Sequence, residues 1–129
     1  MKHPQKGQTG LRRVWNALFY SLAGLSAAFR HESAFRQEVL LACIFLPLAL
    51  LLDVSLKSKA LLIASVMLVL IVELLNSAIE AIVDRVSLEM HPLSKRAKDI
   101  GSAAVFLSLL TLVVVWALVL FERYGSALY

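Results

Sequence analysis

Three long apolar blocks, separated by short polar segments, dominate the hydrophobic pattern of this chain. Unbroken apolar sequence covers residues 39–52 in the first block, and the other two blocks cover residues 60–83 and 100–121. A bilayer core of about 30 Å requires roughly 20 residues of α-helix. The first block is too short alone and must borrow residues at its ends, so the pattern predicts transmembrane helices at about 35–54, 60–83 and 100–121. A short turn is expected at 53–59 and a charged loop at 84–99, where Pro92 and Ser94 indicate that the next helix starts nearby.

The segment before the first block has a different pattern. Between residues 11 and 29 the apolar residues, which include Trp15 and Phe19, recur at helical spacing, and the basic residues lie mostly off that stripe. A basic amphipathic helix beside membrane spans is typical of a helix in the interface plane, although packing on the other helices is an alternative. We therefore predict an all-α membrane protein with an N-terminal amphipathic surface helix at about 11–30 and three transmembrane helices.

Composition agrees with this interpretation. The hydrophobic content is 60%, above the roughly 45–50% of soluble domains, and a chain of 129 residues is too short for two independent cores. We expect a single membrane domain over residues 1–129. The lone Cys43 excludes a disulfide framework within the chain. Neither a cleavable signal peptide nor a nucleic-acid partner is expected.

The basic residues divide unequally between the two sides of a protein with three spans. One side carries ten of them: Lys2, Lys6, Arg12, Arg13, Arg30, Arg36, Arg85, Lys95, Arg96 and Lys98. The other side carries three: Lys57, Lys59 and Arg123. Because cytoplasmic segments are the richer in Lys and Arg, we expect a multi-pass protein of the inner (cytoplasmic) membrane. Its N-terminus would be cytoplasmic and its C-terminus outside.

The second apolar block contains polar residues that lipid contact alone does not explain. Glu73, Asn76 and Glu80 stand at i, i+3 and i+7, so they share one helix face, and the two glutamates lie about 10 Å apart along the axis. A charge near the bilayer centre costs about 2.5–3.5 kcal/mol on insertion scales. These side chains are therefore expected to face a polar pathway, a partner or a site.

Further titratable residues gather at the expected cytoplasmic rim: Glu32, Asp84, Arg85, Glu89, His91, Lys98 and Asp99. Carboxylates beside Lys and Arg suit Mg²⁺ and phosphate groups, and a deeper carboxylate suits a general base acting on a lipid hydroxyl. Phosphoryl transfer from ATP to a lipid alcohol is one interpretation, although no GxxxxGK[ST] loop is present. A proton or cation relay, or simple binding of anionic headgroups, fits the same residues.

Three motifs carry a resemblance to a known family. They are Glu73-x-x-Asn76-Ser77-Ala78-Ile79-Glu80-x-x-Val83-Asp84, then Leu93-Ser94-Lys95-Arg96-Ala97-Lys98-Asp99 with Gly101-Ser102-Ala103-Ala104-Val105, and upstream Glu32-Ser33-Ala34-Phe35-Arg36-Gln37-Glu38. Together they resemble the prokaryotic diacylglycerol kinase family, from about residue 13 to the end of the third span. The resemblance implies a homotrimeric membrane enzyme with active sites between subunits. It would transfer the γ-phosphate of ATP to 1,2-diacylglycerol and form phosphatidic acid, with Mg²⁺.

The resemblance also implies roles for individual residues. Glu73 matches the general base, Asn76 a residue that orders the site, and Glu32 and Glu80 the Mg²⁺ ligands. The positions that match nucleotide contacts are Arg13, Tyr20, Glu32, Glu80, Glu89, Met90, His91, Lys98 and Asp99. The positions that match substrate contacts are Arg13, Ala34, Phe35, Arg36, Gln37, Glu38, Glu73, Ser102 and Trp116.

Several alternatives stay open at this point. The lipid could be undecaprenol, which relatives with a similar acidic motif use, or the chain could be a non-enzymatic ion pathway or a structural subunit that binds lipid. Asn76 could hold helices together instead of serving a site, and Asp84 with Arg85 could form an ion pair at the rim. Ser77 and Gly101 are expected to let helices approach closely.

Overall fold

The protein is almost entirely helical. The computed structural model describes residues 9–86, 89 and 91–128. It contains α1 (Gly10–His31), α2 (Ser33–Leu51), α3 (Leu56–Val86) and α4 (Pro92–Tyr124), followed by a short 3₁₀ turn, Gly125–Leu128, and no strand in the described ranges. Three of the helices, α2, α3 and α4, are long and apolar enough to cross a membrane. The predicted fold class is therefore confirmed.

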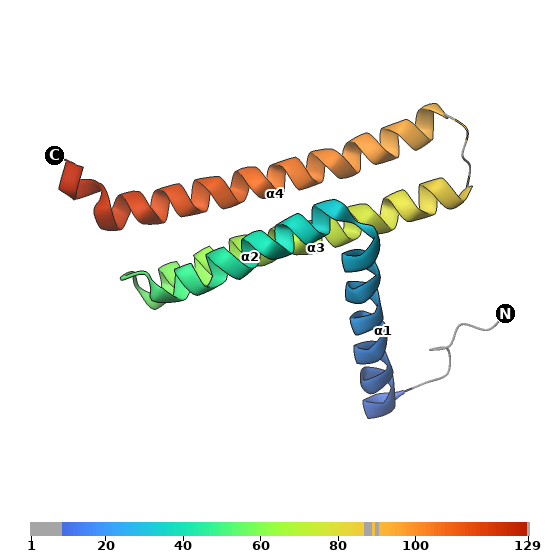
Figure 1. Ribbon diagram of the computed structural model, residues 1–129, viewed down its shortest axis with the longest axis horizontal. Helices are drawn as coiled ribbons and strands as arrows, with labels where there is room; N and C mark the ends of the chain where they lie inside the picture. The colour runs from blue at the N-terminus through green and yellow to red at the C-terminus, as the bar shows by residue number, and fades with distance from the viewer. Residues whose placement is uncertain (1–8, 87–88, 90, 129) are drawn as a thin grey trace.

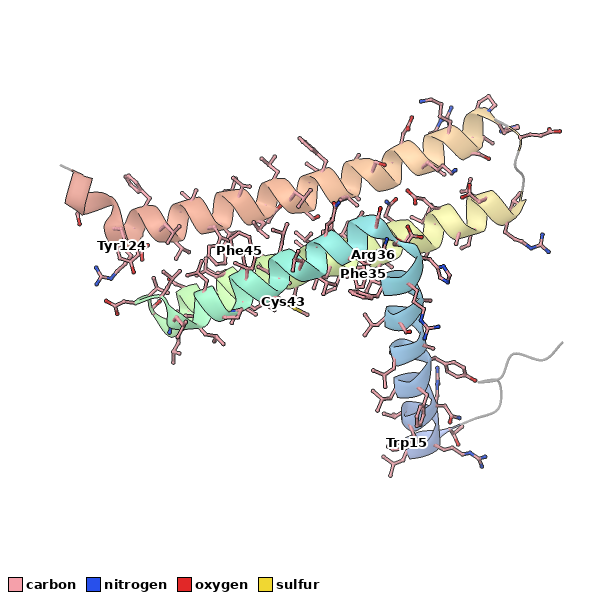
Figure 2. The ribbon with its side chains drawn as sticks, in the orientation of Figure 1. Trp15, Phe35, Arg36, Cys43, Phe45 and Tyr124 are labelled. Carbon is pink, nitrogen blue, oxygen red and sulfur yellow. The ribbon has the colours of Figure 1, made fainter. Side chains whose placement is uncertain are left out.

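The three long helices run alongside one another, and α1 crosses their direction (Figure 1). Helix α3 packs against both α2 and α4, whereas α1 makes its main contacts with α2. Glu32 alone, in extended conformation, separates α1 from α2. The Arg36 side chain donates from Nη1 to the carbonyls of Phe29 (2.8 Å) and Arg30 (3.0 Å). It thus satisfies helix-end carbonyls that lack partners within α1, and this fixes the corner shown in Figure 2.

The buried core lies in the half of the molecule away from the α3–α4 connection. Its members are Ala42, Ala49, Leu62, Val66, Trp116 and Val119. The alanines of α2 let its backbone approach α3 closely. Trp116 packs edge-on against Phe45, with ring centroids 5.1 Å apart, and its Nε1 donates to the Ser65 hydroxyl at 3.2 Å. The core therefore joins all three long helices.

Helix α1 leaves its apolar stripe uncovered. Ala28 is its one buried residue in the described chain, and large side chains such as Leu11 and Trp15 are 88% and 61% exposed. Trp15 lies near the end of α1 that is farthest from the corner (Figure 2). An amphipathic helix with an uncovered apolar face fits a place at the membrane surface better than packing on the long helices.

The helices extend past the ends that hydropathy suggested. The segment 53–59 was expected to be a turn, yet α3 already begins at Leu56, where the Ser55 hydroxyl accepts a hydrogen bond from the Ser58 amide at 3.1 Å. The charged segment 84–99 was expected to be a loop, yet α3 continues to Val86. Helix α4 begins at Pro92, which confirms the start that Pro92 and Ser94 indicated. The turn was therefore expected too long at its end, and the end of α3 was expected too early, because hydropathy marks the apolar part of a helix and not its hydrogen-bonded ends.

At the end of the molecule that carries the α2–α3 turn, an ion pair joins the turn to α4. Arg123 Nη2 lies 2.5 Å from Asp53 Oδ2, and Nε donates to the Asp53 carbonyl at 2.9 Å. The hydrogen bond and charge of Arg123 hold the pKa of the Asp53 carboxyl below its usual value. A depressed carboxyl pKa contributes stability above the unfolded-state value of about 3.9, and that contribution is lost as pH falls through the folded pKa.

We expect Arg123→Gln to lower the thermal midpoint slightly at pH 7, because the pair is solvent-exposed and such pairs contribute little. The difference from the wild type should shrink when Asp53 is protonated at low pH. Thermal unfolding in detergent at pH 7, 5 and 3 measures this, with Lys57→Gln as a control that removes an exposed charge on the same side. A difference that is the same at all three pH values would contradict the assignment.

Candidate active site

Carboxylates from two helices and from the α1–α2 corner gather around the middle of α3. Glu73 is the most buried, at 5% exposed, and the charges of Glu80 and Glu32 both act on it. The charge of Glu73 in turn acts on Glu38 of α2. We call Glu32, Glu38, Glu73 and Glu80 the acidic centre. Such a concentration of negative charge on apolar helices requires cations or protons for its stability.

Asn76 links the acidic centre to α4. Its Nδ2 donates to Glu80 Oε1 at 3.3 Å, and its Oδ1 is buried without a hydrogen-bond partner in the described part of the chain. The amide faces Gly101 so closely that a Cβ atom at position 101 would overlap Asn76 Oδ1. The expected close approach of α3 and α4 at Gly101 is therefore present. It restricts the Asn76 side chain, which in turn orients Glu80.

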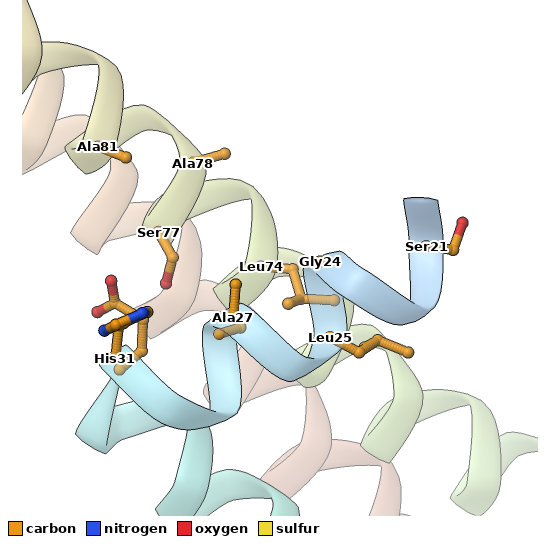
Figure 3. Close-up of a pocket in the computed structure, with 11 residues that line it drawn as sticks. Ser21, Gly24, Leu25, Ala27, His31, Leu74, Ser77, Ala78 and Ala81 are labelled. Carbon is orange, nitrogen blue, oxygen red and sulfur yellow. The ribbon is translucent and has the colours of Figure 1, made fainter. Parts of the chain in front are cut away.

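A groove opens between α1 and α3, with a volume of about 720 Å³. We call it the α1–α3 groove. Its lining is mainly apolar, with polar groups from Ser21, His31, Glu32 and Ser77. Figure 3 shows the Ser77 side chain pointing from α3 into the space beside His31. Glu32 belongs both to the groove and to the acidic centre, so a molecule in the groove would reach the carboxylates with its polar end.

Two salt bridges lie at the start of α4. Lys98 Nζ lies 2.6 Å from Asp84 Oδ1 of α3, and Lys95 Nζ lies 2.6 Å from Asp99 Oδ2. The expected pairing of Asp84 with Arg85 is not what the structure shows. Neighbouring residues on a helix point in different directions, whereas α4 lies beside α3 and brings Lys98 to Asp84.

A shallow pocket of about 450 Å³ lies beside these pairs, lined by Pro92, Lys95, Arg96, Asp99 and Ile100 among others. Its two cationic side chains could neutralise phosphate oxygens. His91 forms the N-cap of α4, since its Nδ1 accepts a hydrogen bond from the Leu93 amide at 3.0 Å. Of the predicted nucleotide positions, Asp99 lines this pocket, Lys98 is its neighbour in the chain, and His91 directly precedes α4.

Other predicted site residues are not brought to the acidic centre within one chain. Arg13 and Tyr20 are exposed on α1, and Arg13 lies about 28 Å along the helix axis from the corner. Trp116 is buried in the core, beside Ser65. Their predicted roles stay predictions.

The remaining predicted positions lie at the corner and beside α4. Phe35 is buried at the corner and Glu38 is half-buried, whereas Ala34, Arg36, Gln37, Glu89 and Ser102 are exposed. Met90 lies outside the described residues. Ser102 follows Gly101 directly, so it is near the contact between Asn76 and α4. The substrate and nucleotide roles of these positions also stay predictions.

The carboxylates of the acidic centre are compatible with Mg²⁺ that binds together with substrate phosphates. Among the described residues no three His, Cys, Asp or Glu side chains are placed to hold a metal ion together. Mg²⁺ bound together with substrate phosphates needs only one or two protein carboxylates. Glu80, oriented by Asn76, and Glu32 could supply these two, so the residues fit a metal that arrives with phosphate.

Sequence reasoning missed two features of the site. Ser77 was expected only to allow close helix packing, but its side chain lines the α1–α3 groove. The second feature is the guanidinium of Arg36, which caps α1, while its predicted contact with substrate stays a prediction. The spacing of Ser77 four residues after Glu73 could have indicated the first feature, whereas nothing local in the sequence indicates the second.

Comparison with known proteins gives consistent matches. A family described as "Prokaryotic diacylglycerol kinase" matches residues 19–120. A protein named diacylglycerol kinase from Pseudomonas aeruginosa is 65% identical over 117 residues, which cover 91% of this chain and 95% of that protein. Proteins of the same name from Escherichia coli K12 and Haemophilus influenzae are each 50% identical. They cover 91% and 88% of this chain and 96% of their own lengths.

Proposed function

Because the chain belongs to the prokaryotic diacylglycerol kinase family, we propose a mechanism for an ATP-dependent diacylglycerol kinase. The enzyme transfers the γ-phosphate of ATP to the free hydroxyl of 1,2-diacylglycerol and releases phosphatidic acid and ADP. The observation that carries the mechanism is the buried Glu73, which lies near enough to Glu32, Glu38 and Glu80 for their charges to interact, in a molecule with a mainly apolar groove between α1 and α3.

Glu73 is the proposed general base. As the lipid oxygen forms its bond to the γ-phosphorus, the bond between that phosphorus and the ADP oxygen breaks, and the hydroxyl proton passes to the Glu73 carboxylate. A base with 5% exposure is shielded from water, which favours transfer to the lipid over hydrolysis of ATP. Most of the catalysis in such reactions comes from positioning and from charge neutralisation.

Glu32 and Glu80 are the proposed ligands of Mg²⁺. When bound, the ion neutralises phosphate oxygens of ATP. Asn76 donates to Glu80 Oε1 and so fixes the direction of that carboxylate. Asn76 itself is held against Gly101. The contacts from Gly101 through Asn76 to Glu80 fix the orientation of the Glu80 carboxylate before a phosphate binds. Such preorganisation is what electrostatic stabilisation of a transition state requires.

The α1–α3 groove is the proposed site of diacylglycerol. Its apolar lining suits acyl chains that remain in the membrane. Glu32 lines the groove and also acts on Glu73. A lipid whose chains follow the groove would therefore present its glycerol hydroxyl to the acidic centre.

The nucleotide is proposed to lie at the start of α4, where Lys95, Arg96 and Asp99 form a pocket. Arg13 and Tyr20 would reach a nucleotide only from another subunit, because α1 extends away from this region (Figure 1). The distance from Arg13 to the corner, about 28 Å of helix, supports active sites shared between subunits, and the homotrimer is proposed from the family resemblance.

The proposed location is the inner membrane, with the N-terminus and the α3–α4 connection in the cytoplasm and the C-terminus outside. The excess of Lys and Arg on one side supports this orientation. The pocket at the start of α4 and the acidic centre would then face the compartment that contains ATP.

Transfer of label from γ-phosphate-labelled ATP into lipid tests the function. Purified protein in mixed micelles is given diacylglycerol or undecaprenol, with Mg²⁺ or with EDTA. We expect label in phosphatidic acid that depends on Mg²⁺. Label in undecaprenyl phosphate alone would change the substrate, and no label in either lipid from folded protein would contradict a kinase. An ion pathway predicts ion flux without ATP consumption.

A further inference from the structure

Ser77 has an unusual hydroxyl group. The residue is 8% exposed, and its Oγ is buried without a hydrogen-bond partner in the described part of the chain. Two other buried serines behave differently: Ser65 donates to the Leu62 carbonyl and Ser108 to the Val105 carbonyl, both at 2.7 Å. A helical serine ordinarily satisfies its hydroxyl on a carbonyl of the preceding turn. Ser77 therefore retains its donor for something else.

The direction of Ser77 indicates where that partner lies. Its side chain lines the α1–α3 groove together with Leu74 and Ala78, and Figure 3 shows it pointing toward the α1 side of that space. Apart from Ser77, the lining of α3 is apolar, formed by Leu74, Ala78 and Ala81. A molecule in the groove would meet one polar group on this wall.

We propose that the Ser77 hydroxyl donates a hydrogen bond to an ester carbonyl of the lipid substrate, so that Ser77 is a specificity-determining residue for acyl glycerols. The inference rests on the proposed function. Diacylglycerol carries two ester carbonyls close to its free hydroxyl. Ser77 stands four residues from Glu73 on α3, about 6 Å along the axis, so one lipid can reach both side chains. A polyprenol has no carbonyl and would leave the hydroxyl unpaired, which disfavours its binding.

The test compares Ser77→Ala with the wild type on two lipids. One is a 1,2-diacylglycerol, and the other is a 1,2-dialkylglycerol of equal chain length, which has the same free hydroxyl but ether links without carbonyls. We expect kcat/KM of the variant for the ester to fall about five- to tenfold, as the loss of one net hydrogen bond gives. Its kcat/KM for the ether should stay unchanged.

Two further variants separate recognition from structure. Ser77→Thr keeps a hydroxyl and should retain most of the preference for the ester. Ser21→Ala removes another hydroxyl of the groove, one already bonded to the Ala17 carbonyl at 2.8 Å, and should leave the ester-to-ether ratio unchanged. An equal loss on both lipids in Ser77→Ala, or no ester preference in the wild type, would overturn the inference while the kinase stands. Failure of the wild type to phosphorylate either lipid would overturn both.

Discussion

Glu73→Gln is expected to lower kcat by about 10²–10⁴-fold, the range that a general base contributes. Glutamine has the shape of glutamate but cannot accept the proton of the lipid hydroxyl. The fold should tolerate the change, since Glu73 is buried and its charge interacts with those of Glu32, Glu38 and Glu80, so that its removal relieves repulsion. The measurement is label transfer into diacylglycerol at saturating ATP, alongside thermal unfolding of the same preparation.

Glu122→Gln is the matched control for this experiment. It removes an exposed carboxylate near the far end of α4, remote from the acidic centre, and should leave kcat unchanged. If Glu73→Gln retained activity within tenfold of the wild type, proton acceptance by Glu73 would be excluded. Loss of activity together with loss of folding would show a structural role for the carboxylate instead.

Gly101→Ala is expected to lower kcat/KM about 10- to 100-fold, the scale of effect that a 1 Å displacement of a site group can have. A methyl group at position 101 would overlap Asn76 Oδ1. Asn76 must then move, and its hydrogen bond to Glu80 is lost or redirected. We expect the concentration of Mg²⁺ that gives half-maximal activity to rise as well, because Glu80 loses its fixed direction.

A double-mutant cycle with Asn76→Ala isolates this effect. In the Asn76→Ala background there is no amide to displace, so the further change Gly101→Ala should cost little, and the two effects should be far from additive. Ala104→Ser adds one heavy atom at an exposed position of the same helix and serves as the control. Additive losses in the cycle would mean that Gly101 acts through helix packing and not through Asn76.

The helices could be predicted well because the residue patterns that indicate them lie within each helix. Apolar blocks of sufficient length and an amphipathic stretch are sufficient to predict three spans and a surface helix. The same periodicity correctly placed Asn76 and Glu80 within contact on one face of α3. The start of α4 was predicted from Pro92 and Ser94 and is confirmed. The start of α3 was predicted less well, because the hydrogen bond of Ser55 there leaves no mark in hydropathy.

Which side chains of different helices contact one another could not be predicted from the sequence. Whether Asp84 pairs with Arg85 or with Lys98 depends on the register of α4 against α3, which no local pattern specifies. Trp116 in the core and Ser77 in the groove depend in the same way on which helix covers which face. The roles of the site residues rest on the family, whereas their distances rest on the structure.

The corner between α1 and α2 is held through main-chain acceptors. Arg36 bonds the carbonyls of Phe29 and Arg30, and these oxygens are the same whatever side chains the two positions carry. Substitutions in the last turn of α1 therefore leave the anchor intact, while replacement of Arg36 removes it at once. The direction of α1 at the corner is thus independent of the side chains at positions 29 and 30, which can vary while Arg36 is retained.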